Sequence, residues 1–94
     1  MTGTKHDSGK LRWRLVPWVQ FKEVVEVLDI GATKYGEHDW VNVPDAKNRY
    51  FDALMRHIMA WVNGERNDPE DGKHHLAHAV ACLLFLMWLE KEDV

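Results

Sequence analysis

Residues 21–30 read Phe21-Lys22-Glu23-Val24-Val25-Glu26-Val27-Leu28-Asp29-Ile30 and carry the clearest structural signal in the chain. In a helix at about 100° per residue, the apolar side chains of this segment gather on one face and both glutamates lie opposite. Val27 and Ile30 share the glutamate face, so a second element is expected to pack there and to take the carboxylates partly out of water. Two like charges in such a place need a cation. The apolar face comprises Phe21, Val24, Val25, Leu28, Ala32 and Tyr35.

Three helices are expected around this signal. The first follows Pro17, which suits a first helical turn, and ends at Lys34 or Tyr35 with Gly36 as its C-cap. The second covers about 45–63 and the third about 73–90. No segment alternates convincingly enough to be a strand. The sequence therefore predicts an all-α fold, a small bundle of three main helices in a single domain over residues 1–94, with residues 1–16 as an extended basic arm.

The expected third helix is apolar on nearly every side beyond its first turn, which is typical of a helix that is central or lies at a subunit interface. A chain of 94 residues buries only a modest fraction of its surface. We therefore expect a homo-oligomer, a dimer or tetramer, to complete the bundle. The expected second helix places its apolar residues on one side, namely Phe51, Leu54, Met55, Ile58 and Val62.

Composition narrows the class of protein. The formal charge of −3 gives no whole-chain nucleic-acid footprint, so no DNA or RNA polymer is expected as partner. A local basic cluster on the arm can still hold phosphate. One cysteine and the lack of an apolar leader segment favour the cytoplasm. The apolar run 76–89 is shorter than the ~20 residues that span a bilayer, so no membrane partner is expected. The basic cluster comprises Lys5, Lys10, Arg12 and Arg14.

Two groups of side chains could hold a metal ion. Glu23 and Glu26 are three residues apart, so their carboxylates can grip one Mg²⁺ or Mn²⁺, although solvated helix faces often show the same spacing. His75 and His78 follow one stripe of the third helix and need hydrogen-bond partners. In one interpretation they are ordinary histidines that face solvent or the core. In the other they face the two glutamates, as metal ligands, as hydrogen-bond donors to phosphate or as a proton relay.

Other side chains could bind a nucleotide. Lys34 and Tyr35, followed in the next loop by Trp40, offer an ammonium group and aromatic plates for a phosphate and a base. The alternative is that Lys34 simply caps the helix dipole. Arg49 and Arg56 share the polar stripe of the second helix, where they either meet phosphate or form an ion-pair ladder with an intervening aspartate.

Seven segments together resemble one family. It is the dATP/dGTP diphosphohydrolase N-terminal domain family, common in bacteriophage proteins and related to MazG-like all-α nucleotide pyrophosphohydrolases. The resemblance spans nearly the whole chain. The segments are Asp7-Ser8-Gly9-Lys10-Leu11-Arg12, residues 23–28, Gly31-Ala32-Thr33-Lys34-Tyr35-Gly36, Asp39-Trp40, Arg56-His57 with Ala60-Trp61, Asp68-Pro69-Glu70 and His75-Leu76-Ala77-His78-Ala79.

The resemblance implies metal-dependent hydrolysis of a purine (deoxy)nucleoside triphosphate to the monophosphate and pyrophosphate, with Mg²⁺ or Mn²⁺ between helices, and the host cytoplasm as location if a phage encodes the chain. We predict Glu23, Glu26 and His78 as catalytic residues, with the metal held by the same three and His75. The predicted substrate-binding residues are Lys10, Arg12, Lys34, Tyr35, Trp40, Arg56 and His57.

The chain departs from the MazG-like pattern in both acidic motifs. Lys22 replaces the first glutamate of a Glu-Glu-x-x-Glu helix. The later Glu-x-x-Asp motif aligns with residues 75–78 or 79–82, and neither register supplies a carboxylate. Two glutamates and two histidines favour one ion or Mn²⁺. Either the ligand set is reduced, or Asp68, Asp71 or another subunit completes it. A non-catalytic nucleotide-binding or sequestering phage protein, or a purely structural helical oligomer, are the alternative interpretations.

Overall fold

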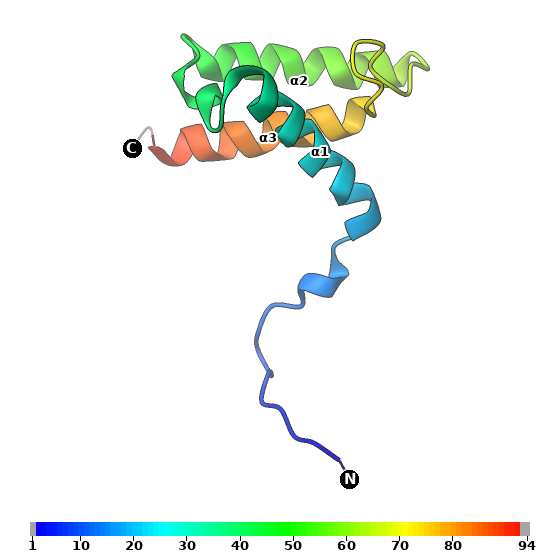
Figure 1. The fold of residues 1–94 in the computed structure, drawn as a ribbon, viewed down its shortest axis with the longest axis vertical. Coiled ribbons are helices and arrows are strands. Elements are labelled where there is room, and N and C mark those ends of the chain that lie inside the picture. Colours follow the sequence, from blue (N-terminus) through cyan, green and yellow to red (C-terminus); the bar gives the residue numbers. More distant parts are fainter. Residues whose placement is uncertain (1, 93–94) are drawn as a thin grey trace.

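The computed structural model describes residues 2–92, with side chains for residues 2–91; residues 1, 93 and 94, which the predicted domain includes, lie outside the described part. Three α-helices dominate and no strand is present in the described range, so the predicted all-α bundle is confirmed. In Figure 1, α2 and α3 run antiparallel side by side, and α1 crosses them and continues away toward the N-terminus. The elements are η1 (Trp13–Leu15), α1 (Trp18–Tyr35), η2 (Asp39–Asn42), α2 (Ala46–Val62) and α3 (His75–Glu92).

Helix ends follow local chemistry. Gly36 caps α1 with a φ of 112°, a conformation open to glycine, and its N–H bonds to the Ala32 carbonyl. Pro17 precedes the first residue of α1, as its fixed φ allows. The third helix begins at His75, two residues later than the sequence indicates, because residues 67 and 74 pair across a closed loop.

The core lies where α3 passes between the other two helices. Ala77, Ala79 and Ala81 of α3 are buried, and their small side chains let neighbouring backbones approach. Leu54 of α2 packs against Ala79 and Cys82, and Val24 is the buried residue of α1. The helix predicted to be central or at a subunit interface thus contacts both other helices, although Leu83, Met87 and Trp88 of α3 remain exposed.

The apolar side predicted for α2 is buried only in part. Leu54 is buried, but Phe51 and Val62 remain more than half exposed. The reason is that α3 packs against the adjacent strip of α2, through Ala53, Leu54 and Ile58. An apolar stripe is therefore left on the outside of α2, at Phe51, Met55, Met59 and Val62.

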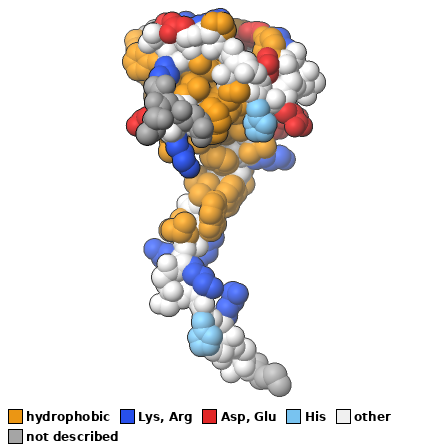
Figure 2. Space-filling model, turned by 90° about the vertical axis from the view of Figure 1, so that its left-hand side faces the viewer, with side chains coloured by type: hydrophobic (Ala, Val, Ile, Leu, Met, Phe, Trp, Pro, Cys, Tyr) orange, Lys and Arg blue, Asp and Glu red, His pale blue; other side chains and the backbone are white. Residues whose placement is uncertain are grey.

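The N-terminal arm leads away from the helices. Residues 2–12 lack helix or strand and are exposed, and the arm extends beyond the first turns of α1 (Figure 1). Figure 2 shows apolar side chains gathered along this narrow part of the molecule. Trp13, Leu15 and Val19 are each more than half exposed. Within the described range, no helix is long and apolar enough to cross a membrane.

Candidate functional site

Glu23 and Glu26 meet the beginning of α3. The Glu23 carboxylate accepts a hydrogen bond from the backbone N–H of His74, and the Glu26 carboxylate lies 3.6 Å from the Lys73 ammonium. A carboxylate is favourable at a helix N-terminus because the backbone N–H groups there are unpaired and the helix dipole is positive. The second element predicted on the glutamate face is therefore the start of α3, and the cation beside Glu26 is Lys73.

The glutamates do not join the histidines in this chain. The described residues contain two groups of three side chains close enough to share a metal ion, and neither includes Glu23 or Glu26. The predicted meeting of His75 and His78 with the glutamates is thus not formed. The physical reason is that α3 turns both histidines toward α2 and the loop 65–72, while its first backbone N–H groups face α1. The two groups are His57, Asp68 and His75, and Asp68, Asp71 and His78.

His75 links a carboxylate to a second imidazole. It is buried, its Nε2 lies 2.6 Å from Glu65 Oε1, and its Nδ1 lies 2.8 Å from Nδ1 of His57. Because an ionised carboxylate only accepts, His75 donates from Nε2 and accepts at Nδ1 from His57. Burial, followed by the neighbouring His78 and His75, lowers the pKa of His57. The network therefore leaves a neutral His57 with its Nε2 lone pair unused.

The loop between α2 and α3 fixes two aspartates. Asp68 Oδ1 accepts from the Glu70 N–H at 2.8 Å, and Asp71 Oδ1 accepts from the Lys73 N–H at 2.9 Å. The backbone closes the loop through Gly72, whose φ of 75° favours glycine and whose N–H bonds to the Asp68 carbonyl at 2.7 Å. Each aspartate thus keeps its second oxygen free for another partner.

Those second oxygens approach His78. Its Nε2 lies 2.8 Å from Asp71 Oδ2 and 3.9 Å from Asp68 Oδ2. The Nε2 atom is buried and close to the Asp71 carboxylate, yet it makes no hydrogen bond with any described residue. The His57 ring stacks on the His78 ring with centroids 4.5 Å apart. One nitrogen and two oxygens therefore converge without satisfying one another.

This group borders a cavity of about 1010 Å³, at the upper limit of the roughly 300–1,000 Å³ usual for ligand pockets. The cavity lies between the C-terminal half of α1, η2, α2, the loop and α3. Five of the predicted site residues line it, whereas six others do not. Arg49, left open between phosphate binding and an ion-pair ladder, also lines it. The five are Lys34, Tyr35, Trp40, His57 and His78; those outside are Lys10, Arg12, Glu23, Glu26, Arg56 and His75.

The cavity has an aromatic and a polar part. Trp40 stacks on Phe85 with ring centroids 4.3 Å apart and meets Trp88 edge-on at 5.2 Å, and Tyr50 donates its hydroxyl to the Trp40 carbonyl. Phe85 lies seven residues beyond His78 on α3, a rise of about 10 Å. An aromatic wall and the Asp–His group therefore face one cavity from two turns of the same helix.

Lys34 stands at the rim of this cavity. Its ammonium lies 3.1 Å from Glu70 Oε1 and 5.3 Å from the centre of the Tyr35 ring. The hydrogen bond to Glu70, followed by the one to Tyr35, raises the pKa of Lys34. Lys34 is thus positively charged and exposed, and is placed to exchange Glu70 for an incoming anion.

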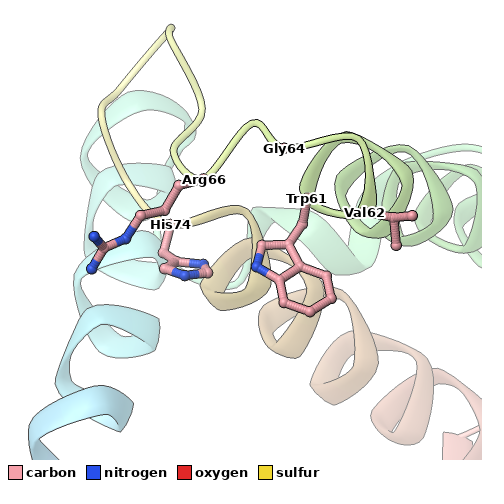
Figure 3. Close-up of a pocket in the computed structure, with 5 residues that line it drawn as sticks. All are labelled: Trp61, Val62, Gly64, Arg66 and His74. Atoms are coloured by element: carbon pink, nitrogen blue, oxygen red, sulfur yellow. The ribbon is translucent and has the colours of Figure 1, made fainter.

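A second hollow, of about 660 Å³, lies on another side of the loop (Figure 3). The Trp61 and His74 rings point toward the same open space, and Arg66 extends away from them. His74 Nδ1 already accepts the Leu76 N–H at 3.0 Å. None of its described lining residues is acidic, so this hollow offers no carboxylate to a metal ion.

Comparison with known proteins identifies the family of the chain. A family model described as dATP/dGTP diphosphohydrolase, N-terminal, matches residues 1–94. The chain belongs to this family. A relative from Salmonella phage PMBT28, named dATP/dGTP diphosphohydrolase, is 39% identical over 89 residues, which is 95% of this chain and 30% of that relative. The chain thus spans less than a third of the relative's length. No solved structure matches it.

Proposed function

We propose that this chain binds a purine deoxynucleoside triphosphate in the large cavity and hydrolyses it to the monophosphate and pyrophosphate with Mg²⁺ or Mn²⁺. The observation that carries the proposal is the cavity itself, where an aromatic wall and an Asp–His group share one space. The name of the phage relative supplies the purine deoxynucleotide as the substrate class. The cytoplasm, where such nucleotides are found, is the compartment we propose.

Each part of the cavity suits one part of the substrate. The Tyr35 ring is exposed and Trp40 is already stacked on Phe85, so Tyr35 is free to cover a base while Trp40 forms the wall beneath it. Lys34 and Arg49 would neutralise the phosphate oxygens, whose charge grows on the leaving pyrophosphate.

The polar part of the cavity suits the attack of water. His57 is neutral and its Nε2 lone pair is unused, so it can accept a proton from the attacking water as a general base. His78 borders the same space with the two aspartates. A divalent cation in such a reaction neutralises phosphate charge and activates the water.

Residues outside the cavity play other parts in this proposal. Glu23 and Glu26 would hold the start of α3, which carries His75 and His78, and would act as metal ligands only if a second copy brought further groups to them. Lys10, Arg12 and Arg56 have no contact with the cavity of their own chain. They would reach phosphate only across a subunit contact.

Self-association is part of the proposal. The apolar stripe of α2 is exposed in a single chain. The apolar side chains along the narrow part of the molecule, at Trp13, Leu15 and Val19, are exposed as well (Figure 2). Exposed apolar side chains that gather into a patch often mark an interaction site. A second copy of the chain is the partner we propose for the α2 stripe.

A non-catalytic nucleotide-binding protein is the second candidate. The observation that favours it is the missing acidic motif on α3, where residues 75–78 and 79–82 contain histidine, alanine and cysteine but no carboxylate. This candidate predicts the same ligand in the same cavity, recovered chemically intact. It differs from the first only in turnover.

The experiment is a nucleotide panel with matched lysine variants. We expect dATP and dGTP to raise the melting temperature in the presence of Mn²⁺ and to release pyrophosphate, and dCTP and dTTP to do neither. Lys34→Ala should weaken binding by about tenfold, the scale of one lost charged hydrogen bond, whereas Lys22→Ala on the outer face of α1 should not. Binding without turnover would select the second candidate, and no binding by any nucleotide would contradict both.

A further inference from the structure

We propose that Asp68, Asp71 and His78 bind one divalent transition-metal ion, of the class that includes Mn²⁺, Fe²⁺, Co²⁺ and Zn²⁺. This ion would belong to the protein and would bind without any nucleotide. The inference therefore does not rest on the proposed hydrolysis.

The first argument is the direction of the ligand atoms. Backbone N–H groups hold one oxygen of each aspartate, so the remaining oxygens are fixed rather than free to rotate toward solvent. Both remaining oxygens lie within 4 Å of His78 Nε2. Carboxylates fixed in this way are typical of metal sites, in which neighbouring groups orient the ligands.

The second argument is the unsatisfied nitrogen. His78 Nε2 is buried and 2.8 Å from an oxygen, yet it is not hydrogen-bonded to any described residue. Buried polar atoms are nearly always paired, so this one calls for a partner. An ion between the nitrogen and the two oxygens would satisfy all three lone pairs at once.

The third argument is charge. Among the described residues, neither Asp68 nor Asp71 forms an ion pair with a lysine or arginine, and two lysines of this region pair with other acids. Lys73 is beside Glu26 and Lys34 is beside Glu70. Both aspartates are more than four-fifths buried, and two carboxylates in such surroundings repel unless a cation separates them.

The ligand chemistry selects the class of ion. One imidazole nitrogen with two carboxylate oxygens suits the first-row transition metals, whereas Ca²⁺ and Mg²⁺ prefer oxygen ligands alone. Three protein ligands leave at least one position open, as in catalytic metal sites. Since His78 and both aspartates line the large cavity, that position would face whatever occupies the cavity.

Neighbouring residues would support the ion. The His57 ring stacks on His78, and Asp68 is shared with the group formed by His57 and His75. Glu65 in turn holds His75. These neighbouring side chains would fix the His78 ring in the orientation that the ion requires.

The test is a titration of metal-stripped chain with Co²⁺ followed by visible absorption, and with Zn²⁺ followed by calorimetry, both without nucleotide. We expect one ion per chain. Asp71→Asn and His78→Gln should each weaken binding more than about 100-fold, because losing even an outer partner typically costs about 10–100-fold. Glu70→Gln removes the same charge from the same loop and should change affinity less than about fivefold, since Glu70 is exposed and bound to Lys34.

A second measurement does not depend on variants. In the wild-type chain, Zn²⁺ should shift the ¹⁵N signal of His78 Nε2, while excess Mg²⁺ should leave it in place. The proposal is overturned if that signal does not move, if Mg²⁺ competes equally, or if both variants, shown to be folded by circular dichroism, bind as tightly as wild type.

Discussion

The histidines show what a sequence can and cannot say about single residues. His75 and His78 were expected to need hydrogen-bond partners, and the structure supplies them for His75 and places acids beside His78. The sequence indicated Asp68 and Asp71 as groups that could complete a ligand set, but it gave no sign of Glu65. Glu65 and Asp71 reach the histidines only because the loop 65–72 folds back on α3, and that closure depends on Gly72 and on backbone bonds without a side-chain signature.

His57 should make stability depend on pH. Its pKa is lowered in the folded chain, chiefly by burial, so the unfolded chain takes up a proton first as the pH falls. Stability is therefore full above the ordinary value of 6.5 and declines below it. We expect chelator-treated wild type to lose stability between about pH 7.5 and about pH 5.5, and His57→Gln to lose less over the same range. Urea denaturation at each pH measures this, and equal slopes for both proteins would contradict it.

At the scale of elements, the positions of the helices along the chain were predictable, but the side that each helix buries was not. Periodicity and capping residues place α1 and α2 within a residue or two, because those signals are local. Which strip of α2 is buried depends on the path of α3, so Phe51 and Val62 remain outside despite lying on the apolar side. Glu23 and Glu26 correctly indicated that their face of α1 is partly buried. The element packed against that face is the N-terminal end of α3.

Glu23 should stabilise the start of α3. Replacing it with alanine removes an acceptor from the His74 N–H and a negative charge from a helix N-terminus, for an expected loss of about 1–2 kcal/mol in the free energy of unfolding. Glu23→Gln keeps an acceptor and should cost about 0.3–1 kcal/mol. Chemical denaturation measures both.

Asp29→Ala on the exposed side of α1 is the matched control and should change stability by less than about 0.5 kcal/mol. If Glu23→Ala were as stable as this control but bound Mn²⁺ far more weakly, the glutamate would be a metal ligand and the role assigned to it here would be wrong.

At the scale of the whole molecule, the sequence indicated a nucleotide site but not the full set of residues that line the cavity. Lys34, Tyr35 and Trp40 were expected to serve a nucleotide, and they do line the cavity. Lys10 and Arg12 do not, because the arm leads away from the helices (Figure 1). Arg49, Phe85 and Trp88 complete the walls, and their place follows from the crossing of α1 over α3, which no local pattern encodes.

The exposed stripe of α2 should mediate self-association. We expect wild type to sediment as a dimer or tetramer, and Met59→Asp to shift it toward monomer because a charge in the centre of an apolar contact is costly. Since Met59 is about half exposed in the single chain, the variant should keep its helical content. Asp52→Asn, an exposed change off the stripe, should leave the assembly unchanged. A wild-type monomer at concentrations of tens of micromolar would contradict this expectation.

The most direct test of the account is the identity of the products formed from dGTP and Mn²⁺, followed by ³¹P NMR. We predict dGMP and pyrophosphate in equal amounts from wild type. Asp71→Asn should be slowed by about 100-fold or more, and Glu70→Gln by far less. Unchanged dGTP after prolonged incubation, or dGDP with free phosphate, would contradict the account.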